Sequence, residues 1–161
     1  MTKHIEKKTN AMRELERANQ EYHAHWFDCE EALSGVEVAH LLDEDPDRVF
    51  KTLVTVGKSG EHYVFMIPVA LELDLKKAAQ AVGEKSVAMV KSKELLGLTG
   101  YIHGGCSPLG MKKRFVTTID ESAELYEVIF FSGGRIGCQI ETSLSSLKAA
   151  LSIAQADITS I

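Results

Sequence analysis

The sequence predicts an α+β fold built on a mixed, largely antiparallel sheet. Segments with strand character outnumber helical ones, glycine turns join neighbouring strands, and no regular strand–helix–strand series runs along the chain. The Gly-Gly pairs lack the G-x-G-x-x-G spacing of a dinucleotide-binding unit, which excludes a Rossmann interpretation of them. With 161 residues, 45% of them hydrophobic, the chain is expected to form one domain with a real core.

The predicted strands are rich in β-branched and aromatic residues and are bounded by glycine, proline or polar turns. Gly57 to Gly60 is expected to close one hairpin, and Gly133-Gly134 a second. The predicted strands cover residues 22–27, 48–56, 62–67, 86–90, 114–119, 127–132 and 135–140.

The predicted helices are placed by their capping residues and by apolar residues near helical spacing. Ser34 and Glu37 have capping-box spacing, Asp74 begins a helix that Gly83 ends, and Ser92 is expected to cap a short one. The first helix is polar enough to be peripheral. The predicted helices cover residues 3–19, 34–42, 74–83, 92–96 and 143–153.

The formal net charge of −5 argues against a general nucleic-acid coat, but charge is unevenly spread along the chain. Residues 28–47 carry eight acidic side chains and no Lys or Arg, whereas residues 76–114 carry eight basic ones against Glu84 and Glu94. If the basic side chains share one face, they could hold a phosphate backbone. The alternative is that each is an ordinary solvated lysine or arginine.

No stretch has the length and hydrophobicity of a signal peptide or of a membrane span of about 20 residues. The three cysteines, Cys29, Cys106 and Cys138, are odd in number, widely spaced and without a C-x-x-C pair. Neither a disulfide framework nor a zinc site is indicated. We therefore expect a cytoplasmic protein with no membrane partner.

Lys51 interrupts an apolar strand, because strand alternation places apolar residues on both faces around it. A lysine in a central strand loses solvation, so it needs an anionic partner or a lowered pKa. The alternative is an edge-strand lysine whose ammonium reaches water and discourages aggregation. The pattern alone leaves both interpretations open.

Residues 100–110 hold four glycines and a proline, which is typical of a shaped loop. Glycines allow backbone N–H groups to approach a ligand closely and to bind a developing oxyanion. A long surface turn is the alternative, but the cations of residues 112–114 follow directly. Cys106 could act as a nucleophile with His103 as its base, but no Asp or Asn nearby is an obvious group to orient the histidine. We therefore expect Cys106 to line a pocket. His23 and His25 lie on one strand face, and the sequence names no third metal ligand for them.

Taken together, the motifs of the chain resemble the YbaK/EbsC family of aminoacyl-tRNA deacylases from about residue 35 to residue 157. The order and spacing of the set are specific, although each motif alone is weak. The resemblance implies a single editing domain over residues 1–161, with a curved, barrel-like mixed sheet, flanking helices and a peripheral helix in residues 1–20. The matching motifs are Phe50-Lys51-Thr52-Leu53, Leu73-Asp-Leu-Lys-Lys77, Gly100-Tyr101, Gly104-Gly105-Cys-Ser107-Pro108-Leu109-Gly110-x-Lys112-Lys113-Arg114 and Ser132-Gly133-Gly134-Arg135-x-Gly137.

The resemblance implies removal of a wrongly attached amino acid from tRNA, above all of cysteine from Cys-tRNA(Pro) and also from Cys-tRNA(Cys). Cysteine and proline have similar volumes, so a synthetase pocket separates them poorly and an editing site is needed. The family uses no metal and no cofactor. The substrate's own thiol is thought to attack the ester, which makes the reaction resemble that of a lyase. The implied partners are the acceptor end of aminoacyl-tRNA and prolyl-tRNA synthetase in a ternary complex.

Site residues are carried over by the same resemblance. Lys51 matches the lysine that holds the terminal adenosine and its phosphate, and the loop glycines match those around the aminoacyl carbonyl. The implied catalytic residues are Lys51, Gly104, Gly105 and Ser107. The implied substrate-binding residues are His25, Phe50, Thr52, Tyr101, Cys106, Pro108, Gly133 and Gln139. The implied tRNA-binding residues are Lys112, Lys113, Arg114 and Arg135.

Two positions depart from the family pattern and leave the substrate open. His25 stands where close relatives carry a tyrosine, and Gln139 where some carry an aspartate. Ala-tRNA(Pro) or another small aminoacyl-tRNA is therefore an alternative substrate. A second alternative is a noncatalytic module that binds an aminoacyl or nucleotide group and partners a synthetase, although retention of Lys51 and the glycine loop favours an enzyme.

Overall fold

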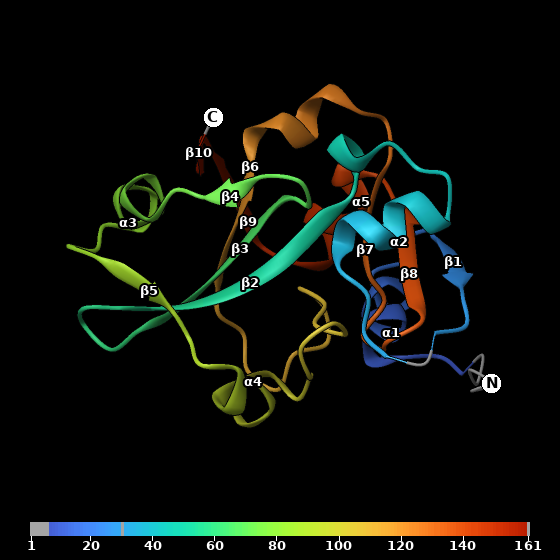
Figure 1. Ribbon diagram of the computed structural model, residues 1–161, viewed down its shortest axis with the longest axis horizontal. Helices are drawn as coiled ribbons and strands as arrows, with labels where there is room; N and C mark the ends of the chain where they lie inside the picture. Colours follow the sequence, from blue (N-terminus) through green and yellow to red (C-terminus); the bar gives the residue numbers. More distant parts are fainter. Residues whose placement is uncertain (1–6, 30, 161) are drawn as a thin grey trace.

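The computed structural model describes residues 7–29 and 31–160 and has an α+β fold (Figure 1). A five-stranded sheet and a three-stranded sheet lie side by side, with helices around them. The strands are β1 (His23–Trp26), β2 (Phe50–Gly57), β3 (His62–Pro68), β4 (Glu72–Leu73), β5 (Val87–Met89), β6 (Val116–Asp120), β7 (Ile129–Ser132), β8 (Cys138–Thr142), β9 (Ile153–Ala156) and β10 (Thr159–Ser160). The helices are α1 (Asn10–Arg17), α2 (Gly35–Leu41), α3 (Leu75–Val82), α4 (Ser92–Thr99) and α5 (Leu144–Ala150), with 3-10 turns at Pro46–Arg48 and Glu121–Leu125.

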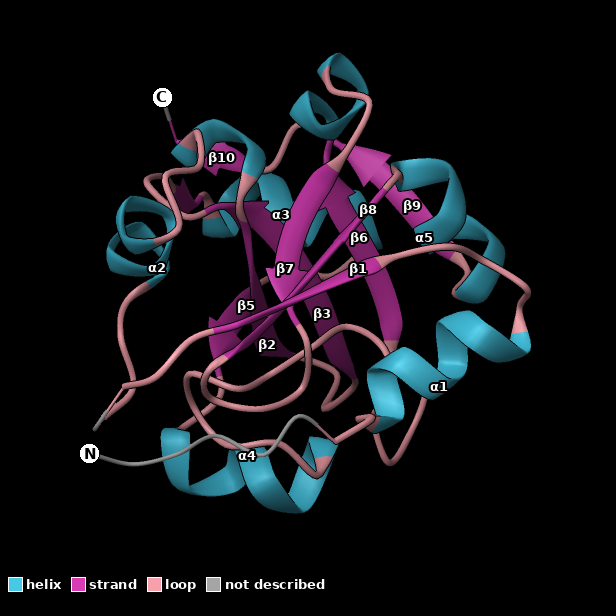
Figure 2. Cartoon of the chain, turned by 90° about the vertical axis from the view of Figure 1, so that its right-hand side faces the viewer, coloured by secondary structure: helices cyan, strands magenta, loops and turns pink. Residues whose placement is uncertain are grey.

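The sheet topology confirms the mixed, largely antiparallel prediction. The larger sheet has the strand order β5-β2-β3-β6-β9, in which the β5–β2 and β2–β3 pairs are antiparallel and the β3–β6 and β6–β9 pairs are parallel. The smaller sheet, β1-β8-β7, is antiparallel and lies in front of β2 and β3 in Figure 2. A single parallel bridge between Val49 and Phe130 links the two sheets, and β4 pairs with β10. The ladders among the described strands do not close into a ring, so the barrel-like shape stays a prediction.

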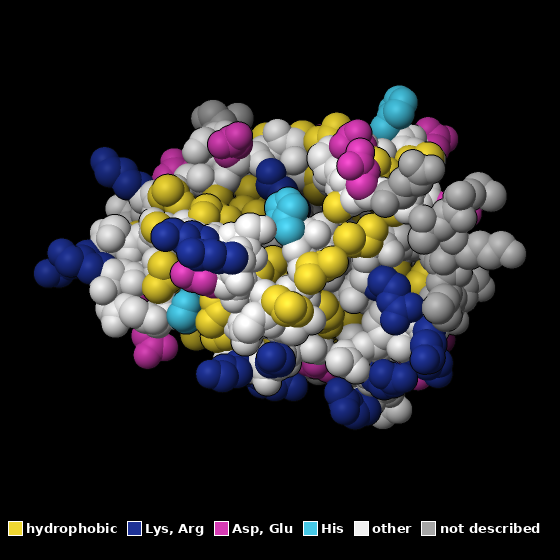
Figure 3. Space-filling view, turned by 60° about the horizontal axis from the view of Figure 1, so that its bottom comes forward, with side chains coloured by type: hydrophobic (Ala, Val, Ile, Leu, Met, Phe, Trp, Pro, Cys, Tyr) yellow, Lys and Arg dark blue, Asp and Glu magenta, His cyan; other side chains and the backbone are white. Residues whose placement is uncertain are grey.

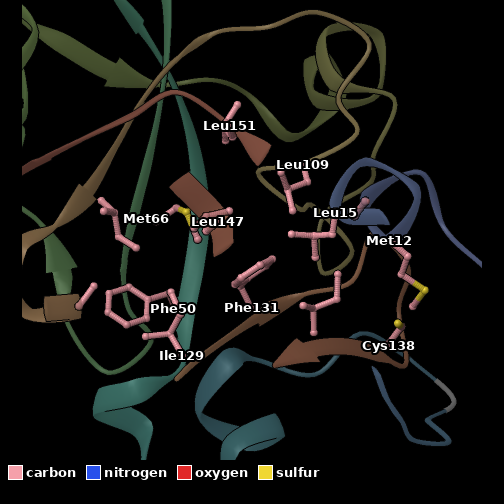
Figure 4. Close-up of a cluster of buried hydrophobic side chains, with 14 residues drawn as sticks. Met12, Leu15, Phe50, Met66, Leu109, Ile129, Phe131, Cys138, Leu147 and Leu151 are labelled. Atoms are coloured by element: carbon pink, nitrogen blue, oxygen red, sulfur yellow. The ribbon is translucent and has the colours of Figure 1, made fainter. Parts of the chain in front are cut away.

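The largest cluster of buried side chains fills the space between the two sheets, α1 and α5 (Figure 4). Met12 and Leu15 of α1 are buried against Phe131 of β7 and Leu147 of α5. Each such side chain contributes about 1.5–3 kcal/mol through burial. The peripheral helix expected from its polarity is therefore anchored firmly by one apolar stripe.

Local capping signals are confirmed where they were strongest. Ser34 Oγ accepts a hydrogen bond from Glu37 N at 3.2 Å, and Glu37 Oε1 accepts one from Ser34 N at 2.9 Å, which completes the capping box of α2. Asp74 Oδ1 accepts from Lys77 N at the start of α3, and Gly83 ends that helix in the left-handed region at φ +75°. These local hydrogen bonds and the left-handed glycine mark the ends of the two helices.

Several predicted boundaries are wrong. The first helix begins at Asn10, because Thr9 caps it, and residues 1–6 of the prediction lie outside the described part of the chain. Lys91, not Ser92, precedes α4, which runs on to Thr99. The closing helix ends at Ala150, and residues 153–156 form β9 beside β6. Among the helices of the described residues, none is long and apolar enough to cross a membrane.

Candidate functional site

A pocket of about 680 Å³ opens where the two sheets meet. Its walls are mostly apolar. They come from β2, from the start of α2, from the β5–α4 connection, from the loop after α4 and from the β7–β8 pair. The lining residues include Leu33, Val38, Val49, Phe50, Lys51, Thr52, Val54, Met89, Leu95, His103, Gly104, Cys106, Phe131, Ser132, Cys138 and Gln139.

Lys51 brings a cation into this pocket. It is half-buried on β2 and lies opposite Ile67 of β3. β2 is an inner strand of its sheet, but β5 pairs only with residues 55–57 of it. At Lys51 the described ladder joins β2 to β3 alone, so the pairing leaves both interpretations of this lysine open. Lys51 makes no hydrogen bond or ion pair with any residue that the structure describes. Its ammonium is therefore available to an anionic or polar ligand in surroundings that strengthen electrostatic attraction.

Two further polar atoms in the pocket walls are without partners. Thr52 Oγ1 and Gln139 Oε1 are buried and have no hydrogen-bond partner among the described residues. Gln139 is only 3% exposed. A buried polar atom without a partner costs about 1–3 kcal/mol. A ligand that supplies hydrogen-bonding groups at these positions would recover that free energy.

The loop after α4 supplies backbone amides. Gly104 has φ +90°, and a Cβ at that position would lie 2.7 Å from Ala32 Cβ, so this conformation and this contact require glycine. The N–H of Gly105 already donates to the carbonyl oxygen of Ile102 at 3.0 Å. The N–H groups of Gly104 and Cys106 donate to no acceptor in the described residues, and both residues line the pocket. These N–H groups are therefore candidates for binding an oxyanion.

Several residues singled out from the sequence lie beneath this loop and not on the pocket surface. Ser107 is fully buried, and its Oγ accepts from Leu109 N at 3.4 Å. Tyr101 Oη donates to the carbonyl oxygen of Leu109 at 2.6 Å. Pro108 is also buried, and Gly133 is so close to Cys138 that a Cβ would lie 2.4 Å from the sulfur. These residues shape the loop and the β7–β8 turn.

The structure brings Phe50, Lys51, Thr52, Gly104, Cys106 and Gln139 together in the pocket wall. His25 does not line it, although it faces Gln139 across the β1–β8 ladder. The Nε2 of His25 lies 2.7 Å from Oε1 of Glu141, so this histidine has a carboxylate partner. Within residues 7–29 and 31–160, no three His, Cys, Asp or Glu side chains are grouped closely enough to hold a metal ion.

The thiol of Cys106 is poorly suited to act as a nucleophile, because it stays protonated near neutral pH. The side chain is 8% exposed, and burial raises its pKa to about 12, despite a smaller opposing effect of hydrogen bonding to Thr99. Burial similarly raises the pKa of Cys138 to about 12. Because the thiolate is the reactive species, both cysteines are poor nucleophiles near neutral pH. This agrees with a packing role.

Sequence reasoning missed Glu44, whose carboxyl lies behind the pocket wall. Burial raises its pKa, while the side chain of Gln139 and the charge of His25 act in the opposite direction. Glu44 Oε1 is buried without a hydrogen-bond partner among the described residues. The sequence showed only an acidic run around this position. Nothing in the run distinguished one half-buried carboxyl from its solvated neighbours.

The predicted tRNA-binding cations lie on the outer side of the same loop. Lys112, Lys113 and Arg114 are exposed around a second hollow of about 400 Å³. Arg135 is half-exposed in the turn between β7 and β8. Figure 3 shows Lys and Arg side chains gathered along the lower right of one face of the molecule. Lys112, Lys113 and Arg114 thus share the loop 100–114 with the pocket, whereas Arg135 does not.

Comparisons with known proteins place the chain in a family. A model of the aminoacyl-tRNA editing domain matches residues 29–149. The chain is 44% identical over 160 residues to EbsC of Enterococcus faecalis, which is named for Cys-tRNA(Pro)/Cys-tRNA(Cys) deacylation; the match covers 98% of this chain and 96% of that one.

Solved structures agree on the fold. A crystal structure of a hypothetical protein matches with a TM-score of 0.86 and 22% identity, covering 94% of this chain and 100% of the other. A crystal structure described as a trans-editing enzyme for prolyl tRNA synthetase matches with a TM-score of 0.77 and 24% identity over 87% of each chain. The match of the family model to most of the chain and the full-length similarity to EbsC show that this protein belongs to the aminoacyl-tRNA editing domain family.

Proposed function

We propose that this protein is a free-standing trans-editing enzyme that removes cysteine from Cys-tRNA(Pro) and from Cys-tRNA(Cys). Family membership makes it an aminoacyl-tRNA deacylase, and its full-length relative is named for these two substrates. The observation that carries the proposal is the unpartnered ammonium of Lys51 in a pocket that Gly104 and Cys106 also line. The N–H groups of these two residues donate to no acceptor among the described residues. A cation and two amide donors suit the terminal nucleotide and its ester.

The proposed reaction is substrate-assisted. The cysteine sulfur of the substrate attacks its own ester carbonyl carbon, a carbon–sulfur bond forms, and the bond from that carbon to the ribose oxygen breaks. The thiol proton is lost and the ribose oxygen takes up a proton, which leaves a thiolactone and an uncharged tRNA. The protein holds the reactive conformer, and the amides of Gly104 and Cys106 stabilise the negative charge on the carbonyl oxygen.

Each remaining group of the pocket has a proposed role. Lys51 binds the terminal adenosine and its phosphate, Phe50 and Thr52 pack beside the nucleoside, and Gln139 faces the amino-acid side chain. Gly105, Ser107, Tyr101, Pro108 and Gly133 act by shaping the loop and the turn. His25 acts through its position opposite Gln139 on the ladder.

The proposed partner is the acceptor end of aminoacyl-tRNA, which Lys112, Lys113, Arg114 and Arg135 contact through phosphates. A tRNA substrate places the activity in the cytoplasm, and a structural relative named as acting for prolyl tRNA synthetase supports a ternary complex with that enzyme. We treat residues 1–161 as a single editing domain, with the two bridged sheets as its curved, barrel-like wall.

Ala-tRNA(Pro) is the second candidate substrate, because His25 and Gln139 replace residues that the family uses near the amino acid. The test is to incubate the purified protein with Cys-tRNA(Pro), Ala-tRNA(Pro) and Pro-tRNA(Pro). Loss of the ester is measured for each, together with the chemical form of the released amino acid. Fast loss from the cysteine species with a thiolactone product supports the proposal, and preferential loss from the alanine species selects the second candidate. No loss from any species refutes both and leaves a noncatalytic binding module.

A further inference from the structure

The hollow between α1 and residues 108–115 is lined by charges of mainly one sign. Arg17 of α1 and Lys112, Lys113 and Arg114 of the loop contribute four cations against the single carboxylate of Glu14. All four cations are exposed side chains. Such a hollow can accept several phosphate oxygens at once.

The carboxylate of Glu14 is already engaged with the loop. Its Oε2 accepts a hydrogen bond from Gly110 N at 2.8 Å, and its Oε1 lies 3.4 Å from a guanidinium nitrogen of Arg114. Glu14 is 13% exposed, whereas Arg114 is 70% exposed. The carboxylate thus ties the loop to α1, while the outer face of the Arg114 guanidinium stays open to a ligand.

Helix and loop are also in direct backbone contact. Gly110 has φ +73°, and a Cβ there would lie 2.7 Å from Asn10 C and 2.8 Å from Ala11 N. This close approach fixes the first turn of α1 against the loop that carries the cations. The hollow is therefore a built feature of two elements that are far apart in the sequence.

We propose that this hollow binds the phosphate backbone of the tRNA acceptor stem, and that α1 is part of the tRNA interface through Arg17. The proposal rests on the proposed function, because the terminal nucleotide has to occupy the pocket. Gly104 lines the pocket and Gly110 lines the hollow, and six residues of chain span at most roughly 20 Å. Nucleotides that precede the terminal one are therefore within reach of the hollow.

The test compares Arg17→Ala with Arg13→Ala. Both substitutions remove one exposed arginine from α1, but Arg13 lies outside the hollow and donates to Asn10 Oδ1 at 3.2 Å. Binding of uncharged tRNA is measured by fluorescence anisotropy at several salt concentrations. Arg17→Ala should weaken binding about threefold to tenfold and reduce the slope of log affinity against log salt by about 0.7–0.9, whereas Arg13→Ala should change neither substantially.

A second measurement separates the hollow from the pocket. The ester of cysteine with adenosine alone lacks the acceptor stem, so Arg17→Ala should leave its cleavage unchanged while raising KM for Cys-tRNA(Pro). Equal effects of the two arginine variants on tRNA binding, or an equal loss with the small ester, overturns the proposal. If the wild-type protein binds tRNA through Arg17 but cleaves neither ester, the proposed function fails and the interface stands.

Discussion

The pocket and the hollow beside α1 share the loop 100–114 but differ in the groups that line them. The pocket is apolar, and its polar atoms at Lys51, Thr52 and Gln139 have no partners among the described residues. The hollow beside α1 is polar and open, and its carboxylate is already hydrogen-bonded. Buried polar groups without partners gain about 1–3 kcal/mol each when a ligand satisfies them, whereas exposed ion pairs gain about 0.2–1 kcal/mol each.

This difference shows how one loop can contribute both to the rate of the proposed reaction and to the affinity for the substrate. Interactions that strengthen only in the transition state raise kcat, and these require fixed donors such as the amides of Gly104 and Cys106. Contacts that are equally strong in the ground state and the transition state act on KM, and we expect the proposed phosphate contacts of the hollow to be of this kind. Substitutions in the pocket should therefore reduce turnover, and those in the hollow should not.

The largest effect is expected from Lys51→Ala. Removal of a charged hydrogen-bond donor from a half-buried site costs about 1.5–3 kcal/mol, which lowers kcat/KM for Cys-tRNA(Pro) roughly tenfold to 150-fold. Because Lys51 has no partner among the described residues, the thermal unfolding temperature should hardly change. The control is Lys58→Ala, which removes an exposed lysine from the β2–β3 turn. Normal turnover in Lys51→Ala would show that the pocket contains no cation essential for the reaction, and the proposed difference between pocket and hollow would then be wrong.

The next largest effect is expected from Gly104→Ala. The left-handed backbone at φ +90° costs a residue with a Cβ about 1–2 kcal/mol, and the contact with Ala32 forces the amide out of place. The rate of ester cleavage should fall about 100-fold, as for the loss of one oxyanion donor.

Gly60→Ala is the matched control for this substitution. It has nearly the same φ, +94°, and open space around the added methyl group, so it should cost stability alone. Adding Ala32→Gly to Gly104→Ala removes the steric contact and should restore part of the rate. Equal rates for Gly104→Ala and Gly60→Ala would show that this amide has no role in the reaction.

These two positions also show how much the sequence can predict. Lys51 and the glycine loop were recognisable because each breaks a local pattern, one as a charge in an apolar strand and the other as clustered glycines. The capping residues of α2 and α3 were recognisable for the same local reason. Patterns within a few residues are read reliably because neighbouring backbone groups determine them.

Features that depend on distant parts of the chain were not predictable. Residues 153–156 became β9 because β6 offers a free edge in parallel register, and this pairing overrides the helical spacing before it. The N–H of Gly105 is engaged with the carbonyl oxygen of Ile102, whereas those of Gly104 and Cys106 are not hydrogen-bonded within the described residues. The link between Glu14 and the loop joins residues 96 positions apart. No local pattern carries such information.

A smaller effect is expected from Glu44→Gln, and it should be an effect on the free energy of unfolding. Burial raises the pKa of Glu44 in the folded state, so its favourable contribution is fully present below the unfolded pKa and is lost as pH rises through the folded pKa. The variant cannot ionise and should be more stable than the wild type at pH 7, with a difference that shrinks in acid. Urea unfolding at several pH values measures this, with the exposed Glu127→Gln as control.

The charged groups facing Glu44 are His25, Glu141 and Arg48, and their effects on its pKa are smaller than that of burial. If His25 and Arg48 outweighed burial, Glu44→Gln would be less stable than the wild type at pH 7. That result would mean that the wall behind Gln139 is held by an ionised carboxylate. The pocket would then differ less from the charged hollow than we infer.

The smallest effect on the reaction is expected from Cys106→Ala. Because burial raises the pKa of this thiol to about 12, it contributes almost no thiolate at pH 7, and in the proposed reaction the nucleophile is the substrate's own thiol. The initial rate of Cys-tRNA(Pro) cleavage should stay within about threefold of the wild type, as for a packing residue. Iodoacetamide at pH 7 should modify the half-buried Cys29 well before Cys106 or Cys138, as followed by mass spectrometry. A rate that falls to background in Cys106→Ala but not in Cys29→Ala would make the protein sulfur the nucleophile, and the pocket would then catalyse by covalent attack instead of by holding its substrate.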